Sequence, residues 1–196
     1  MPPSPFSLPS APPKPPVFRV DIPLLPESAV GCALQLIDLL RGANLLASLR
    51  LGAQAPHLAW RLLDAEGLPL TPLPGPLAAY MAPDDGAAAH APAQALLIPS
   101  FHAPDIPAIR TVAARHQALS RQLGIALDTG QKLLTMGNGA WLAAQSGRLN
   151  GRQACLPWFY IAGFERDFPG IGHSLGQDLA DDGPWLSCAL PSNVNL

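Results

Sequence analysis

Residues 133–152 read LLTMGNGAWLAAQSGRLNGR, an apolar run, a glycine-rich turn and then a run of helix-forming residues. This order predicts a strand, a sharp turn and a helix. Many enzymes place a nucleophile at the tip of such a turn, but here the tip reads Gly137-Asn138-Gly139, without Ser, Cys or Asp. The small residues let the turn close, and the following helix would point free backbone N–H groups into the site.

The rest of the chain alternates in the same way, which predicts one α/β domain with a mainly parallel sheet and helices on both faces. Ligand sites in this architecture lie at the carboxyl ends of the strands, here at 26–31, 99–103 and 137–139. Residues 68–86 are broken by proline and predict short edge pieces and loops. Strands are expected at 17–26, 57–67, 94–101, 131–136 and 151–158. Helices are expected at 29–49, 106–123, 140–146 and 158–167, and Asp105 and Gly124 would begin and end the second of them. A hairpin is expected within 170–190, with its turn at Asp181-Asp182-Gly183.

Charge is scarce in this chain. Only 13% of its residues are charged, the net charge is −2 and no cluster of Lys or Arg occurs, which argues against DNA binding by this chain alone and favours a compact or oligomeric body. The helix expected at 29–49 has a single narrow polar stripe, so we expect most of its circumference to be buried. Gln35, Asp38 and Arg41 interrupt its apolar run, which indicates a soluble helix and no membrane span.

The three cysteines, Cys32, Cys155 and Cys188, have no CxxC or Cys/His zinc spacing. We therefore expect no disulfide, no metal and no cofactor, and a reducing cytoplasm as the location. The N-terminus lacks the basic region and apolar run of a secretory signal. Residues 1–16 hold eight of the 24 prolines and predict an extended, disordered tail.

The segment GNGAWLAAQSGRLNGRQACLPWFYIAGFERDFP resembles the ThiJ/PfpI-like (class I glutamine amidotransferase-like) superfamily. More narrowly, it is similar to the N-terminal domain of GlxA-type regulators in the AraC family. The runs RVDIPLLPESAVGCALQLIDLLRGANLLA, ALLIPSFHAPD and DDGPWLSCA agree in order. The resemblance implies a flavodoxin-like domain over 17–196, without the family's last helix and its C-terminal helix-turn-helix domain.

The departures from the family pattern concern its reactive groups. The elbow cysteine falls on Gly137, the histidine before Trp158 falls on Pro157, and the acidic residue of the first helix falls near Cys32. A glycine pair of the oxyanion loop becomes Ser100-Phe101. Glycine cannot replace a thiolate and proline cannot act as a base, so we expect no enzymatic activity of the family's usual type.

The resemblance implies a ligand-sensing and dimerising domain of a transcription regulator, with DNA bound only by the absent C-terminal domain. Two alternatives stay open: an enzyme (hydrolase, amidase or glyoxalase-like) that uses an atypical site such as Cys32, or a purely structural dimerisation domain. We expect no membrane partner, and a small polar or anionic ligand. Asn138 either contacts that ligand or merely tolerates a left-handed turn. The expected pocket lies between Cys32, Ser100, Phe101, Gly137, Asn138 and Trp158.

Overall fold

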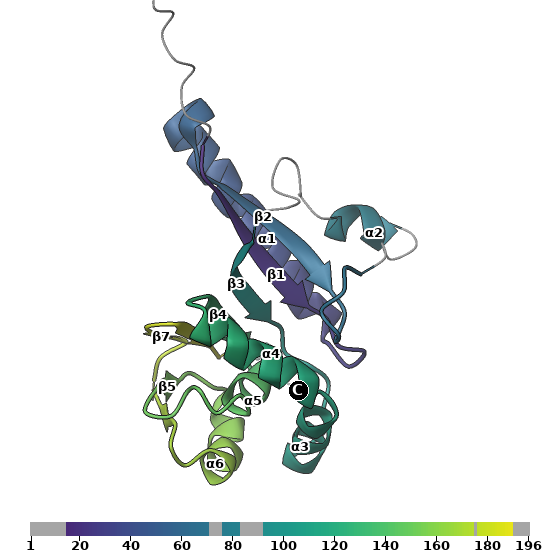
Figure 1. Cartoon of the computed structure of the whole chain (residues 1–196), viewed down its shortest axis with the longest axis vertical. Coiled ribbons are helices and arrows are strands. Elements are labelled where there is room, and N and C mark those ends of the chain that lie inside the picture. The colour runs from purple at the N-terminus through teal and green to yellow at the C-terminus, as the bar shows by residue number, and fades with distance from the viewer. Residues whose placement is uncertain (1–14, 71–75, 83–91, 175, 190–196) are drawn as a thin grey trace, which may run out of the picture.

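A six-stranded sheet forms the centre of the computed structural model, which describes residues 15–70, 76–82, 92–174 and 176–189 (Figure 1). The strand order is β2-β1-β3-β4-β8-β7, and every neighbouring pair is parallel except β7 with β8. The predicted single α/β domain with a mainly parallel sheet is confirmed. The strands are β1 (Val17–Pro23), β2 (His57–Leu63), β3 (Ala93–Ile98), β4 (Lys132–Met136), β7 (Leu179–Asp182) and β8 (Trp185–Cys188).

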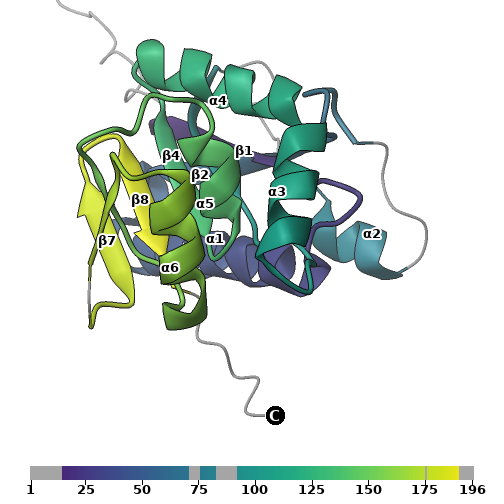
Figure 2. The same cartoon turned by 90° about the horizontal axis from the view of Figure 1, so that it is seen from below.

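Helices cover both faces of this sheet, as Figure 2 shows from below. The long helix α1 lies on one face, where its buried side chains join those of β1, β2 and β3 in one apolar cluster. On the other face, α3, α4, α5 and α6 enclose the larger cluster around Trp141 and Trp185. The helices are α1 (Val30–Leu51, followed by a 3-10 turn at Gly52–Gln54), α2 (Pro76–Met81), α3 (Ile106–Arg115), α4 (Gln117–Asp128), α5 (Gly139–Ala144) and α6 (Trp158–Asp167).

The prediction of one helix over 106–123 is wrong, because two helices follow one another there. Asp105 caps α3 as expected, and its side chain accepts a hydrogen bond from the N–H of Ala108 (2.8 Å). His116 then leaves the helical conformation (φ −101°, ψ 35°) and separates α3 from α4. Gly124 does not end α4, because it is a packing position: a Cβ there would lie 3.5 Å from the Cβ of Ser146. The helix ends instead before Gly130, whose φ is +84°.

Two further regions differ from their predictions. The strand expected over 151–158 shrinks to β5 (Gln153–Ala154), which pairs with β6 (Gly172–His173) in a separate small sheet. Of the hairpin expected within 170–190, β7 and β8 form it and the segment containing β6 does not. The helix α2 lies within 68–86, where only edge pieces and loops were expected. Most of the proline-rich segment 1–16 lies outside the described residues.

The expectation that α1 is buried around most of its circumference is also wrong. Only Ala33, Leu36, Ile37 and Leu40 are buried, because the helix is an outer layer that touches the sheet along one side (Figure 2). Leucines on its other sides are exposed to solvent. By length and composition alone, the helical stretch Val30–Gln54 could cross a membrane, a test that core helices of soluble proteins also pass.

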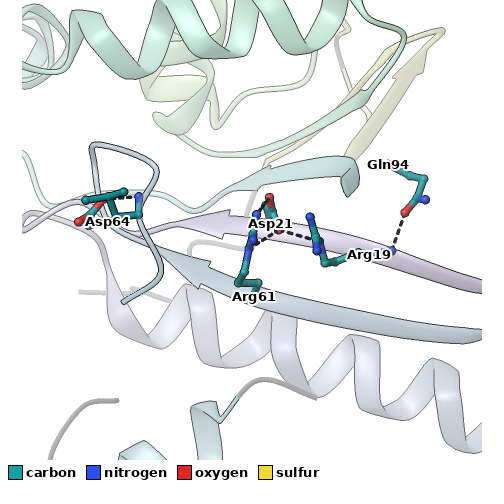
Figure 3. A network of polar contacts seen from close by, with 6 residues as sticks. Arg19, Asp21, Arg61, Asp64 and Gln94 are labelled. Atoms are coloured by element: carbon teal, nitrogen blue, oxygen red, sulfur yellow. Dashed lines mark hydrogen bonds and ion pairs between the residues drawn. The ribbon is translucent and has the colours of Figure 1, made fainter. Parts of the chain in front are cut away.

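An ion-pair network lies on the face of β1 that points away from α1 (Figure 3). The Asp21 carboxylate accepts two hydrogen bonds from Arg61 on the neighbouring strand (2.7 and 3.2 Å) and lies 3.4 Å from the Nε of Arg19. Nearby, the Arg19 N–H donates to the side-chain oxygen of Gln94 (2.6 Å), at the point where the register of β1 and β3 shifts. Arg19 and Asp21 are buried. On this face of β1 and β2, ion pairs therefore take the place that apolar side chains usually fill.

Candidate functional site

The ends of β1, β3 and β4 meet at one edge of the sheet, as the strand-end argument predicts. Ser28, in the loop after β1, forms an isolated antiparallel bridge with Phe101, which follows β3. The N–H of Ala29 donates to the carbonyl of Ser100 (2.8 Å), which ties the start of α1 to the end of β3. In the turn after β4, the side chain of Asn138 bonds to the same two residues, Ser100 and Phe101. We call the turn Gly137-Asn138-Gly139 together with Ser100-Phe101 the elbow.

Gly137 is the residue of the elbow with a left-handed backbone. Its φ is +50°, in the left-handed region that favours glycine. Its N–H donates to the carbonyl of Cys188 on β8 (3.0 Å). A Cβ at this position would lie 3.1 Å from the Oγ of Ser100, so Ser100 occupies part of the space into which an elbow side chain would project.

Gly139, the first residue of α5, is required by close packing. A Cβ on it would lie 2.8 Å from the carbonyl oxygen of Pro99 and 2.9 Å from that of Ile98. Both neighbours are backbone atoms that cannot rotate away, so any larger residue would push α5 off the end of β3.

Asn138 is completely buried, and its amide group is bonded to the loop after β3. Its Oδ1 accepts hydrogen bonds from the Oγ of Ser100 (2.7 Å) and the N–H of Phe101 (2.9 Å), and its Nδ2 donates to the carbonyl of Phe101 (2.8 Å). The backbone of Asn138 is right-handed (φ −72°), so it does not provide the left-handed residue of the turn. Its side chain clamps the elbow from inside.

Three thiols lie near one another, with Cys32 and Cys188 beside the elbow, and burial raises the pKa of each. Burial raises the pKa of the Cys32 thiol, and this effect outweighs the lowering of the pKa by the backbone N–H groups of Ser100 and of Cys32 itself. Burial also raises the pKa of Cys155. It raises that of Cys188 to about 11, with the nearby thiols of Cys155 and Cys32 adding to the effect. All three cysteines are free, and the raised pKa values disfavour the reactive thiolate form of each.

The structure brings five of the six predicted pocket residues together, and the sixth, Trp158, is exposed to solvent. Cys32, Ser100, Phe101, Gly137 and Asn138 meet at the elbow through the contacts given above. Trp158, the first residue of α6, is 80% exposed, and its ring lies edge-on to that of Phe159 with centroids 5.6 Å apart. Pro157 immediately precedes α6 and offers no side-chain proton donor or acceptor.

A cavity beside the elbow was missed by sequence reasoning. Its volume is about 340 Å³, and it lies between the ends of β1 and β2 and the start of α4. No motif marked it, because its lining comes from two loops and one helix junction far apart in the sequence. Only the strand end at 26–31 pointed to this area. The lining residues are Leu24, Leu25, Pro26, Ser28, Val30, Asp64, Ala65, Glu66, Leu70 and His116.

An ion-pair cluster fixes one wall of this cavity. Glu27 accepts a hydrogen bond from Arg115, and its Oε2 lies 3.0 Å from the Nε2 of His116. Burial alone would raise the pKa of Glu27, but hydrogen bonds from His116 and the backbone, together with the charges of His116 and Arg115, lower it below its ordinary value of 4.5. The N–H of His102 also donates to the carbonyl of Glu27 (2.8 Å). The cluster therefore joins the β1–α1 loop to both the elbow and the α3–α4 junction.

Metal binding has no support in the part of the chain that the structure describes, where no group of three or more His, Cys, Asp or Glu side chains could hold an ion.

Comparison of the fold with solved structures finds several similar proteins. A candidate transcriptional regulator from Vibrio parahaemolyticus has 15% sequence identity and a TM-score of 0.63, over 89% of this chain and 84% of the other. An AraC-family transcriptional regulator from Pseudomonas putida has 22% identity and a TM-score of 0.57, over 89% and 85%. A ThiJ/PfpI-family protein from Pseudomonas syringae has 13% identity and a TM-score of 0.50, over 95% and 69%.

The sequence itself matches no protein-family model and no curated protein. At these identities the similarity to solved structures defines the fold, and it confirms the fold that the resemblance implies. The chain has the ThiJ/PfpI (DJ-1/PfpI) fold, which it shares with transcription regulators of the AraC family.

Proposed function

We propose that this chain is a non-catalytic, ligand-sensing and dimerising domain of an AraC-family transcription regulator. One observation carries the proposal: the residue in the left-handed conformation of the elbow is Gly137, which has no side chain to act as a nucleophile. Ser100 Oγ partly fills the space in front of it, and the Asn138 amide fills the turn behind it. A regulator needs the shape of this site and can do without a reactive group.

The state of the thiols supports the non-catalytic reading. A thiol reacts as a thiolate, and burial raises the pKa of Cys32 and Cys188 away from neutrality. The backbone N–H of Ser100 acts to lower the pKa of the Cys32 thiol, against the larger effect of burial, and this is the observation that favours the alternative of an enzyme with an atypical site. Three free thiols also fit a reducing cytoplasm, where we place the protein.

The ligand of the proposed sensor would occupy the cavity beside the elbow. A volume of about 340 Å³ suits a small metabolite. Most of the lining is apolar, and Asp64 and Glu66 add carboxyl groups, so the cavity fits a small molecule with an apolar body and a hydrogen-bond donor or positive charge better than an anion. This modifies the expectation of a polar or anionic ligand.

The cavity is connected to the element that would transmit the signal. Val30 lines it and is also the first residue of α1. Ser28 and Glu27, one on its lining and one behind it, bond to Phe101 and His102 after β3. A ligand that displaces this loop would therefore move the start of α1 and shift a conformational equilibrium.

A thermal-shift screen tests the sensor. Small amines, amides and zwitterions with apolar bodies are added to the wild type, and at least one is expected to raise its melting temperature. Val30→Trp, which places a large ring at the cavity, should abolish that shift. Phe18→Trp is the matched control, since both residues are partly exposed and Phe18 lies at the far end of β1. A shift that survives Val30→Trp would place the ligand elsewhere.

Two further experiments test the other parts of the proposal. The coding sequence that follows the codon of Leu196 should encode a helix-turn-helix domain, and a stop codon there would count against a regulator. Alkylation of Cys32 by iodoacetamide should be slow at pH 7. Rapid alkylation, together with an activity that Cys32→Ser removes, would instead establish the enzyme.

A further inference from the structure

His116 keeps one hydrogen-bonding atom without a partner on the lining of the cavity. The residue is only 9% exposed, and its Nε2 lies 3.0 Å from the Oε2 of Glu27, which stands behind the lining. Among the described residues, none bonds to the other ring nitrogen, Nδ1, and that atom is not sealed from solvent. Nδ1 is therefore the ring nitrogen that a molecule in the cavity can reach.

The other polar side chains of the lining are either used by the fold or exposed. The Oγ of Ser28 accepts a hydrogen bond from a backbone N–H of its own loop (2.8 Å). The Oδ1 of Asp64 accepts from the N–H groups of Glu66 and Leu68 (3.0 and 2.8 Å), which holds the turn after β2. Glu66 itself is exposed. Recognition of a polar group inside the cavity therefore falls to His116.

Glu27 determines which nitrogen of His116 carries the proton. One oxygen of its carboxylate accepts a hydrogen bond from Arg115, and the other faces Nε2. Despite burial, the pKa of Glu27 lies below its ordinary value of 4.5, so the group is ionised at neutral pH. An ionised carboxylate only accepts hydrogen bonds, so Nε2 must hold the proton. In the neutral ring, Nδ1 is then an acceptor.

The charge and the size of the cavity narrow the class of ligand further. The lining and the cluster behind it carry the carboxylates of Glu27, Asp64 and Glu66 against the guanidinium of Arg115. An anionic ligand would meet like charge there and would bring no proton to Nδ1. The volume of about 340 Å³ is roughly twice the ~150 Å³ that takes up one benzene ring. A ring or branched chain with a short arm that ends in a cation fits these conditions.

We propose that the cavity binds a small primary amine in its ammonium form, which donates a hydrogen bond to the Nδ1 of His116 while its apolar body packs against the apolar part of the lining. In this arrangement His116 selects the head group. Glu27 is a positioning residue, because it holds the tautomer in which Nδ1 accepts. The inference rests on the ligand-sensing part of the proposed function and names the class of ligand.

The position of His116 connects the bound head group to the fold. His116 separates α3 from α4, and Glu27 ties it to the loop between β1 and α1. Hydrogen bonds in a chain polarise one another, so an ammonium group at Nδ1 strengthens the bond from Nε2 to the carboxylate. The amine therefore tightens the contact between the α3–α4 junction and the loop that leads into α1.

Nitrogen NMR of isotope-labelled histidines tests the tautomer without any ligand. At about pH 8, where histidine side chains are neutral, the proton of His116 is expected on Nε2. In Glu27→Gln, Arg115 can only donate and keeps the side-chain oxygen, so the new NH₂ group faces Nε2 and the proton moves to Nδ1. A wild-type ring with its proton on Nδ1, or a ring unchanged by Glu27→Gln, would overturn the role of Glu27.

A series of head groups tests the class of ligand. Phenethylamine, phenethyl alcohol and hydrocinnamate share one apolar body and end in an ammonium, a hydroxyl and a carboxylate. In NMR titrations at about pH 8, the amine is expected to bind at least ~10-fold more tightly than the other two, as a hydrogen bond from a charged group allows. A preference for the alcohol or the carboxylate, or an amine that does not bind, would overturn the proposed class.

Substitutions test the contact with Nδ1. His116→Phe keeps a ring and removes the acceptor, so it should weaken the amine at least ~10-fold. His102→Phe is the matched control, because His102 is exposed and lies off the lining; it should bind the amine as the wild type does. Glu27→Gln should weaken the amine and strengthen hydrocinnamate, a reversal that misfolding cannot produce. Equal affinity of the amine for His116→Phe and the wild type would overturn the contact.

Binding of the amine should also depend on pH. Histidine side chains gain a proton between about pH 8 and 5, and a protonated Nδ1 cannot accept. The carboxyl groups of Glu27, Asp64 and Glu66 and the guanidinium of Arg115 are the other charged groups at the cavity; carboxyl groups titrate near pH 4 and guanidinium keeps its charge. The amine should therefore bind at least ~10-fold more weakly at about pH 5, and His116→Phe should remove this dependence. A wild-type affinity that is unchanged by pH would contradict recognition by His116.

The outcomes separate this inference from the proposed function. The thermal-shift screen with Val30→Trp reports whether the cavity holds any ligand. A ligand that depends on Val30 but binds His116→Phe as well as the wild type would leave sensing standing and overturn this inference. A screen in which no compound of any class binds would overturn both.

Discussion

Truncation of Asn138 gives the sharpest test of how the elbow is held together. Asn138→Ala removes the group that satisfies the N–H and the carbonyl of Phe101, a residue that is itself buried. Each buried backbone group left without a partner costs about 1–3 kcal/mol. The half-buried Ser100 hydroxyl can turn to water, so its lost bond adds little. The expected loss of stability for the two groups is therefore about 2–6 kcal/mol.

Urea unfolding, followed by the fluorescence of the buried Trp141 and Trp185 at one protein concentration, measures this loss. With a slope of about 2 kcal/mol per molar urea, the midpoint should fall by about 1–3 M. Asn150→Ala is the matched control, because Asn150 is exposed and such changes stay within about 0.5 kcal/mol. A loss below about 1 kcal/mol for Asn138→Ala would refute the clamp and leave its amide available to a ligand.

Three further predictions concern the elbow, the sheet and pH. Gly137→Ala should lower the free energy of unfolding by about 1–3 kcal/mol, because φ is positive and because the new methyl group would contact Ser100 Oγ. Adding Ser100→Gly to the same chain should restore only the part of the loss that is due to this contact, which a double-mutant cycle measured by urea unfolding would show. Asp21→Ala removes the carboxylate beside buried Arg19 and should cost about 3 kcal/mol in urea unfolding; a loss under 1 kcal/mol would contradict a stabilising network. The pKa of Glu27 is lowered in the folded state, so the carboxylate's contribution to stability is present above pH 4.5 and is lost as the pH falls below it. In thermal melts between pH 5 and 3, the Glu27→Gln protein should therefore lose less stability than the wild type. Equal losses would contradict a stabilising role of the Glu27 cluster.

The fold could be predicted from the sequence because its signals are local and repeated. Apolar runs of strand length alternate with helical spacing, and this alternation leaves few arrangements other than a parallel sheet. The same reasoning located the elbow, since glycine at 137 and 139 meets needs of the backbone itself. Boundaries were less predictable where a tertiary contact decided them. Gly124 looks like a helix stop in the sequence, and its contact with Ser146 is visible only in three dimensions.

The candidate site was less predictable because its polar groups pair over long distances along the chain. Asn138 was identified as important, but the partners of its amide are 37 and 38 residues away, so the sequence could not show that they occupy it. The cavity and the Glu27–His116 pair, 89 residues apart, left no motif. The apolar sequence of α1 gave a wrong prediction as well. It predicts a helix that is buried on all sides, but it does not show whether the same molecule buries it.

The strand order has a consequence for how the chain acquires its structure. β1 is made first, but it lies between β2 and β3, and β4 lies between β3 and β8, the last strand of the sheet in the sequence. The bond from Gly137 N–H to Cys188 therefore joins the elbow to a residue synthesised some fifty positions later. Such distant pairings fold slowly, and the elbow cannot take its final form on the ribosome before the end of β8 has emerged. Until then, the edge of β4 is open to contact with other unfinished chains.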